Sequence, residues 1–152
     1  AAATGLPVCL MHMQGEPGTM QQQPRYEDVL AELDAFFEAR VSACAEAGID
    51  AARLVMDPGF GFGKALAHNV RLLDHLAHFR RHGPLLVGLS RKSMLGSLLG
   101  GAPVDRRLHA GLAAAVIAVM KGASIVRVHD VKATTDALAV ASAVLQSRYQ
   151  ET

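Results

Sequence analysis

The sequence predicts an α/β fold of four β/α units, which is half of an eight-stranded TIM (β/α)8 barrel. Short apolar runs alternate with longer segments in which apolar residues recur at helical spacing, as they do in βαβ units with a parallel sheet. The apolar runs are nearly continuous, which is typical of strands covered on both faces. No linker or low-complexity stretch divides residues 1–152, so we expect a single domain over the whole chain.

Four apolar runs predict the strands, at residues 6–13, 54–57, 85–89 and 124–129. Helical periodicity predicts helices at residues 25–47, 65–81, 91–99, 107–121 and 132–148. Gly48 and Gly122 follow two of these helices and are suited to ending them. Residues 1–5 resemble the last turn of a helix with its glycine stop, so we expect further β/α units upstream.

Composition excludes several classes of protein. With 51% hydrophobic and 19% charged residues, the chain can build a core and is not disordered. Fifteen Lys and Arg against fourteen Asp and Glu give no overall field for nucleic acid or an anionic membrane. No uncharged apolar stretch approaches the roughly 18 residues of a membrane span, and no signal peptide is visible. Cys9 and Cys44 lie in separate apolar segments, which predicts buried free thiols and a reducing, cytoplasmic location.

Side chains with chemical capability follow all four predicted strands. In parallel β/α architectures the ligand site lies at the carboxyl ends of the strands. Strands of a sheet without a ligand site would more often end in Gly, Asn or Ser turns. The polar segments at these ends are residues 11–14, Asp57, residues 90–93 and residues 127–130.

Asp57 begins a glycine-rich segment, Asp-Pro-Gly-Phe-Gly-Phe-Gly-Lys, at residues 57–64. The aspartate has two interpretations: a turn or N-cap residue, or a carboxylate that accepts hydrogen bonds from an amino-substituted heterocycle. The glycine spacing fits neither a Walker A loop nor a dinucleotide fingerprint. Glycine would let the backbone approach a ligand closely, while Phe60 and Phe62 offer flat apolar faces. We expect one of the two phenylalanines to belong to the core.

Two candidate anion sites follow the third and fourth strands. Ser90 can cap the helix that follows it, and the cationic Arg91 and Lys92 would crowd the positive end of that helix unless an anion is bound there. Arg127 and His129 alternate with valines, so both point to one side of the sheet. For this pair an internal salt bridge to Asp57 and a bound phosphate or diphosphate both remain open.

The other histidines predict less. His75, His78 and His82 share one helical face, which favours a solvated polar stripe over a metal site. His12 has no Cys or Asp partner at ligand spacing, and His109 indicates no function. Neither a Ser-His-Asp order nor an HExxH motif is present, which argues against a hydrolase.

Four segments together resemble the C-terminal half of the bacterial dihydropteroate synthases, which are TIM barrels of folate biosynthesis and the targets of sulfonamides. The segments are LPVCLMHMQGEPGTMQ, DPGFGFGK, PLLVGLSRKSMLG and ASIVRVHDV, in the family's order, and the resemblance covers essentially all 152 residues. It implies a pterin-binding domain and a transferase. That enzyme joins 4-aminobenzoate to (7,8-dihydropterin-6-yl)methyl diphosphate, releasing diphosphate and 7,8-dihydropteroate.

The resemblance also implies roles for individual residues. Asp57 matches the aspartate that binds the pterin ring, and Lys92 matches a lysine between the pterin and the aminobenzoate. Ser93 matches the serine that receives the aminobenzoate carboxylate. The remaining matches are Arg127 and His129 at the diphosphate, Phe62 and Arg91 at the aminobenzoate pocket, and Met11, Gly61 and Gly88 on the pterin side. Of these, Lys92, Arg127 and His129 are the expected catalytic residues.

The first four β/α units of that family have no counterpart in this sequence. By the resemblance, they carry the asparagine that binds Mg²⁺, so we expect no metal ligand among residues 1–152, and no activity from this chain alone. The complete parent is expected to be a cytoplasmic homodimer acting on small molecules, not on nucleic acid or a membrane. Two alternatives stay open: another pterin-binding barrel, such as a methyltetrahydrofolate methyltransferase, and a non-catalytic half-barrel.

Overall fold

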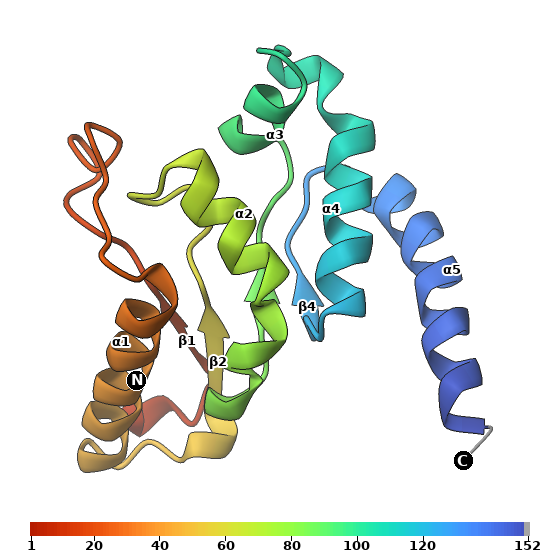
Figure 1. The fold of residues 1–152 in the computed structure, drawn as a ribbon. Helices are drawn as coiled ribbons and strands as arrows, with labels where there is room; N and C mark the ends of the chain where they lie inside the picture. Colours follow the sequence, from red (N-terminus) through yellow and green to blue (C-terminus); the bar gives the residue numbers. More distant parts are fainter. Residues whose placement is uncertain (151–152) are drawn as a thin grey trace.

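The computed structural model describes residues 1–150, with side chains described to residue 147. Strands and helices alternate along the chain, as predicted, and Figure 1 shows their arrangement. The strands are β1 (Val8–Met11), β2 (Leu54–Asp57), β3 (Leu86–Val87) and β4 (Ile125–Val126). The helices are α1 (Val29–Glu46), α2 (Leu66–Asp74), α3 (Ser93–Leu98), α4 (Leu108–Met120) and α5 (Val131–Gln150). Short 3₁₀ helices are η1 (Ala2–Thr4), η2 (Ala51–Arg53), η3 (Leu76–His82) and η4 (Val104–Arg106).

The strands pair in parallel, which confirms the predicted α/β class. β1 pairs with β2, β3 pairs with β4, and a parallel bridge between Met56 and Leu85 connects the two pairs. Side chains from α1, η3 and the strands form the core between sheet and helices, with Leu33, Phe37 and Phe79 fully buried. α4 and α5 lie side by side at the C-terminal end of this arrangement (Figure 1). No helix within residues 1–150 is both long and apolar enough to span a membrane.

Three of the four strands are shorter than predicted, whereas β2 has the predicted bounds. The apolar runs at residues 6–13, 85–89 and 124–129 predict strands from side-chain character, but a strand also requires a neighbour with free backbone groups in register. The backbone N–H of His12 still bonds the Asp57 carbonyl at 3.0 Å, and beyond that point the chain turns away from the sheet. Pairing therefore ends where the polar residues begin.

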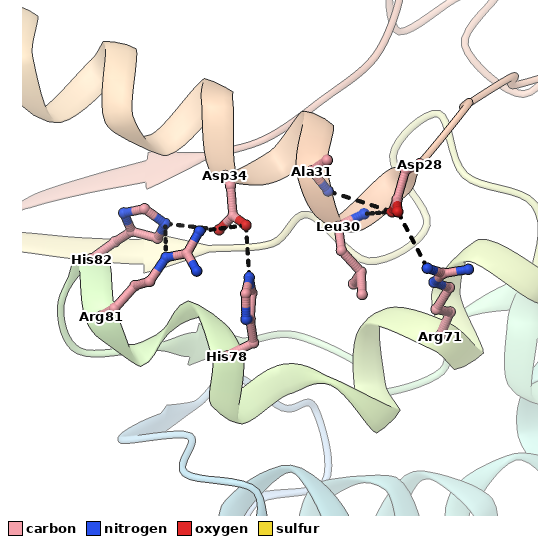
Figure 2. A network of polar contacts seen from close by, with 8 residues as sticks. All are labelled: Asp28, Leu30, Ala31, Asp34, Arg71, His78, Arg81 and His82. Atoms are coloured by element: carbon pink, nitrogen blue, oxygen red, sulfur yellow. Dashed lines mark hydrogen bonds and ion pairs between the residues drawn. The ribbon is translucent and has the colours of Figure 1, made fainter.

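The first helix starts at Val29, four residues later than predicted, because Asp28 caps it. The Asp28 carboxylate accepts hydrogen bonds from the backbone N–H groups of Leu30 and Ala31 (Figure 2). The predicted helix at 65–81 is divided into α2 and η3, with His75 between them. The tighter winding of η3 places its end beside α1.

Of the three histidines predicted to form a solvated stripe, His75 and His78 are exposed, as expected, but His82 is largely buried against α1. Asp34 of α1 accepts from His78 at 2.6 Å and from His82 at 2.9 Å, and it also pairs with Arg81 (Figure 2). The side chain of His82 is only 8% exposed. Burial alone would raise the pKa of Asp34, but the hydrogen bonds from His78 and His82 outweigh it and hold that pKa below its usual value. The histidines thus join η3 to α1.

The two cysteines are free, as expected, but the prediction that both are buried is wrong. Cys44 is half-buried and Cys9 is exposed. Cys9 lies opposite Val55 in the β1–β2 register, two residues before the pair of Met11 and Asp57. Because side chains two residues apart share a face, Cys9, Met11 and Asp57 project from the same face of the sheet. This inner face is open, so an apolar residue on it is not necessarily buried.

Candidate functional site

Asp57 ends β2 on the inner face and is 2% exposed. Its Oδ1 accepts a hydrogen bond from the Gly59 N–H at 2.8 Å, and its Oδ2 lies 3.3 Å from the Arg127 guanidinium. The turn interpretation of Asp57 and the internal salt bridge to Arg127 are therefore both present. The Arg127 side chain remains 56% exposed, so its guanidinium is accessible from the inner face.

Three cationic side chains surround this one carboxylate. Besides Arg127, both Lys64 and Lys92 interact electrostatically with Asp57. Burial lowers the pKa of Lys92, with Asp57 opposing the change and Arg127 adding to it. Burial also lowers the pKa of Lys64, to about 7. An excess of positive charge in a concave, partly buried region favours an anionic ligand.

The three glycines after Asp57 have φ angles of 67°, 76° and 63° at positions 59, 61 and 63, a region that favours glycine. A Cβ at Gly59 would overlap the carbonyl oxygen of His12, and one at Gly63 would overlap that of Gln14. The expectation that these glycines make room for a ligand is therefore wrong for Gly59 and Gly63. They make room for the end of β1 instead.

Phe60 and Phe62 have different environments. Phe60 is 1% exposed and belongs to the core, which confirms that one phenylalanine is structural. Phe62 is half-buried, and the Lys92 Nζ lies 4.0 Å from the centroid of its ring. The same Nζ donates to the Phe60 carbonyl at 2.7 Å. A Cβ on Gly61 would lie 3.2 Å from Lys92 Cδ, so Gly61 lets the loop and this lysine approach each other.

The predicted cap at Ser90 is wrong. α3 begins after Lys92 and has no side-chain cap. Ser90 instead accepts from the His129 N–H at 3.3 Å, and its hydroxyl lies 3.1 Å from His129 Nδ1. Because Arg91 has a φ of 61°, the chain turns before the helix begins. Arg91 pairs with Asp130 at 2.8 Å.

Four of the ten predicted site residues line one hollow, namely Gly88, Lys92, Arg127 and His129. A Cβ on Gly88 would lie 3.0 Å from the Arg127 guanidinium, so this glycine leaves space for the arginine. Arg91 and Ser93 are exposed and do not line the hollow, and Met11 is 36% exposed on the inner face. The hollow has a volume of about 190 Å³ and is lined by Gly88, Ser90, Lys92, Arg127, Val128 and His129.

Two residues of the site were not predicted. His12 and Lys64 are 7% and 3% exposed, and the Lys64 Nζ lies 2.8 Å from His12 Nδ1. Burial and the neighbouring Lys64 charge lower the pKa of His12 to about 4. Two sequence features could have indicated these residues as part of the site. Lys64 directly follows the glycine loop, and His12 lies at the end of the first predicted strand.

Within residues 1–150, no group of three or more His, Cys, Asp or Glu side chains is placed to hold a metal ion. A larger hollow of about 900 Å³ lies beside the start of α1. It contains none of the predicted site residues.

Sequence comparison identifies the class of protein to which this arrangement belongs. The family model described as "Pterin binding enzyme" matches residues 1–129, so the chain belongs to the family of pterin-binding enzymes.

Within this class, the chain is similar to dihydropteroate synthases. It is 56% identical to that of Escherichia coli over 149 residues, which is 97% of this chain and 52% of the relative. Its identity to the Haemophilus influenzae enzyme is 52% over 141 residues, which is 92% of this chain and 51% of the relative. The chain spans about half the length of the curated relatives it matches.

Solved structures agree with the sequence comparison. The Yersinia pestis dihydropteroate synthase in a complex with a sulfonamide drug superposes with a TM-score of 0.93 and 51% identity, over 96% of this chain and 53% of that one. The Xanthomonas albilineans enzyme in complex with 7,8-dihydropteroate gives a TM-score of 0.87 and 46% identity, over 95% of this chain and 52% of that one. The observed arrangement of strands and helices is therefore similar to that of about half of each of these two chains.

Proposed function

We propose that residues 1–152 form the C-terminal half of a TIM (β/α)8 barrel whose complete form is a dihydropteroate synthase. The reaction condenses 4-aminobenzoate with (7,8-dihydropterin-6-yl)methyl diphosphate, giving 7,8-dihydropteroate and diphosphate. One observation carries the proposal: the buried Asp57 carboxylate lies within a group of three cations at the carboxyl end of the sheet. This combination suits a ligand with a donor-rich ring at one end and a polyanion at the other.

The pterin diphosphate would bind across β2 and β4. The Asp57 carboxylate accepts hydrogen bonds from the ring, with Gly61, Gly88 and Met11 beside it. The diphosphate lies against Arg127 and His129. The exposed guanidinium offers a planar pair of donors to phosphate oxygens, and the Ser90 hydroxyl holds the His129 ring at 3.1 Å.

The 4-aminobenzoate would bind above Phe62 and Lys92. The half-buried ring of Phe62 offers an apolar face, and its Lys92 neighbour lies between the two substrates. Ser93, at the start of α3, is the proposed partner of the carboxylate. Arg91 forms an outer wall, where its pairing with Asp130 fixes its direction.

In the proposed reaction the C–O bond at the pterin methylene breaks and the aniline nitrogen attacks the methylene carbon. Charge grows on the departing diphosphate, so Arg127 and His129 bind the transition state more strongly than the ground state. Lys92, which lines the same hollow, contributes a further positive charge. The aniline nitrogen loses a proton once the C–N bond has formed.

Mg²⁺ is the proposed cofactor of the complete enzyme. The described residues offer no ligand cluster, so Mg²⁺ would be held by the diphosphate and by residues outside this chain. When bound, it would neutralise phosphate charge.

A homodimeric state, a cytoplasmic location and small-molecule partners are also proposed for the complete protein. A homodimer is supported by exposed apolar side chains on the outer helices, at Ile117, Val131, Val140 and Val144. A cytoplasmic location is supported by two cysteines that remain free. The near-zero net charge of +1 supports small molecules rather than nucleic acid as the partners.

The test is an assay of the full-length protein that contains this chain. We expect 7,8-dihydropteroate to form from the two substrates, with competition by sulfonamides against 4-aminobenzoate. The 152-residue chain alone is expected to be inactive. Methyl transfer from methyltetrahydrofolate without dihydropteroate formation would favour the other pterin-binding barrel. Absence of both reactions from the full-length protein would favour a non-catalytic role.

A further inference from the structure

The loop at residues 59–63 is held almost entirely by side chains. Every carbonyl of this loop accepts a hydrogen bond from a side chain. The donors are Lys64 to Gly59 and Phe62, Lys92 to Phe60, Gln21 to Gly61 and Tyr26 to Gly63. Three glycines at positive φ would otherwise leave this loop many conformations, so these donors determine its shape.

Lys64 is the donor that contacts two loop carbonyls at once. Its ammonium lies 3.0 Å from the Gly59 oxygen, 3.1 Å from the Phe62 oxygen and 2.8 Å from His12 Nδ1. An ammonium has three N–H donors, and these three acceptors use all of them. When Lys64 carries its proton, the His12 ring accepts the third of these bonds as a neutral imidazole with its Nδ1 lone pair toward the lysine. The low pKa of His12, about 4, agrees with this arrangement.

The two carbonyls that Lys64 binds are at functionally important points of the loop. Gly59 also donates its N–H to Asp57 Oδ1, and Phe62 carries the ring over which Lys92 lies. Lys64 itself is 3% exposed and is bonded on all three N–H groups, so it is not placed to bind substrate. It acts through the loop.

We propose that Lys64 and His12 form a clamp that positions the 59–63 loop, and through it the Phe62 ring and the Lys92 ammonium, for binding of the aromatic substrate. Lys64 is thus a positioning residue. This proposal rests on the proposed function for the identity of the substrate, but the clamp itself rests only on contacts within the chain.

Two kinds of measurement on the full-length protein test the clamp. The variants are Lys64→Met, which removes the donors, and the nearly isosteric pair His12→Asn and His12→Leu, of which only Asn keeps an acceptor near the Nδ1 position. Lys121→Met is the matched control, because Lys121 bonds Asp74, away from the loop. Hydrogen exchange of the 59–63 amides reports the loop directly, and steady-state kinetics reports its consequence.

We expect Lys64→Met to increase exchange in the 59–63 segment and to raise the KM for 4-aminobenzoate by about tenfold or more, as loss of hydrogen bonds from a charged group does. Binding of diphosphate alone at Arg127 and His129 should weaken much less than binding of 4-aminobenzoate, because Arg127 and His129 line the hollow and Lys64 does not. His12→Leu should show the same pattern more weakly, and His12→Asn and Lys121→Met should resemble the unmodified protein.

Unchanged exchange in Lys64→Met, or equal exchange in the two His12 variants, would overturn the clamp. An equal loss of 4-aminobenzoate and diphosphate binding would also overturn it, because that pattern indicates a general structural role. If Lys64→Met does not fold, the His12 pair decides the question. If the unmodified protein makes no dihydropteroate, the proposed function fails, while hydrogen exchange still decides whether the clamp exists.

Discussion

Asp57 combines a structural contact with a proposed binding contact, and the two can be separated by one substitution. In Asp57→Asn the amide oxygen can keep the Gly59 N–H bond, but the amide nitrogen then faces Arg127 in place of Oδ2. Loss of a hydrogen bond to a charged group costs about 1.5–3 kcal/mol, so we expect pterin binding to weaken by roughly 10- to 150-fold. Calorimetric titration of the full-length variant measures this. A large fall in melting temperature with pterin binding intact would show that Asp57 serves only the turn.

Arg127 follows β4 and Ser93 begins α3, and the two are proposed to bind different substrates. Arg127→Ala should weaken the pterin diphosphate by roughly 10- to 150-fold. Turnover should also fall, since diphosphate charge grows in the transition state. Ser93→Ala should spare diphosphate binding and raise the KM for 4-aminobenzoate. Titration of diphosphate against both variants, with kinetics in 4-aminobenzoate, makes the comparison. Equal damage to both substrates from either substitution would contradict the two-pocket assignment.

His12 predicts a pH dependence of stability. Its pKa is about 4 in the folded protein against 6.5 for an unperturbed histidine, so between these values the unfolded state binds more protons. The free energy of unfolding must therefore fall as pH falls from about 6.5 to about 4, by about 3–3.5 kcal/mol from this group. Urea unfolding across this range measures it. His12→Asn removes the titrating ring, and a slope unchanged in that variant would exclude His12 as the source.

At the scale of the elements, apolar patterns predicted which segments are strands and helices but not where each one ends. β2 was predicted with its observed bounds because both of its neighbours, β1 and the Leu85 region, pair with it. The ends of β1, β3 and β4 depend on backbone pairing that side-chain patterns do not encode. The break between α2 and η3 at His75 was not predicted, and the residues of η3 contact Asp34, which is distant from them in sequence.

Asp34 should accordingly stabilise the contact of α1 with η3. Asp34→Ala removes the partner of His78, Arg81 and His82, one of which is nearly buried, so we expect a loss of about 1–3 kcal/mol in the free energy of unfolding. Asp136→Ala is the control, because its pair with Lys132 is exposed and of the i,i+4 type, which contributes about 0.3–0.5 kcal/mol. Chemical denaturation compares the two. Similar losses would show that the Asp34 cluster contributes no more than a surface ion pair.

At the scale of the whole molecule, the approach of Asp57 to Arg127 could be predicted from the sequence, because parallel strands of one sheet present their carboxyl ends together. Strand position alone brought Asp57 and Arg127 onto one face, although they are 70 residues apart in the chain. The clamp could not be predicted, since Lys64 and His12 meet only because the glycine loop folds back on β1. The cap assigned to Ser90 failed for a related reason: its hydroxyl is used by His129, from the neighbouring strand.

The open inner face and the sheet edges predict how the 152-residue chain behaves by itself. Leu6, at 64% exposed, and Ile125, at 45%, present apolar surface beside β1 and on β4. Unpaired parallel edges and exposed apolar faces promote association. We therefore expect the isolated chain to associate or aggregate, whereas the full-length protein should form a defined homodimer.

Light scattering after size-exclusion chromatography measures both species, and two paired variants identify the surface responsible. The first pair, Leu6→Lys and Ile125→Lys, places charge beside β1 and on β4. The second pair, Val140→Lys and Val144→Lys, places charge on the exposed side of α5. If the open sheet causes association of the isolated chain, the strand variants should reduce it and the helix variants should not. In the full-length protein the helix pair should weaken the homodimer, because its proposed interface is on the outer helices. A monodisperse monomer of the unmodified 152-residue chain would contradict the role given to the open sheet.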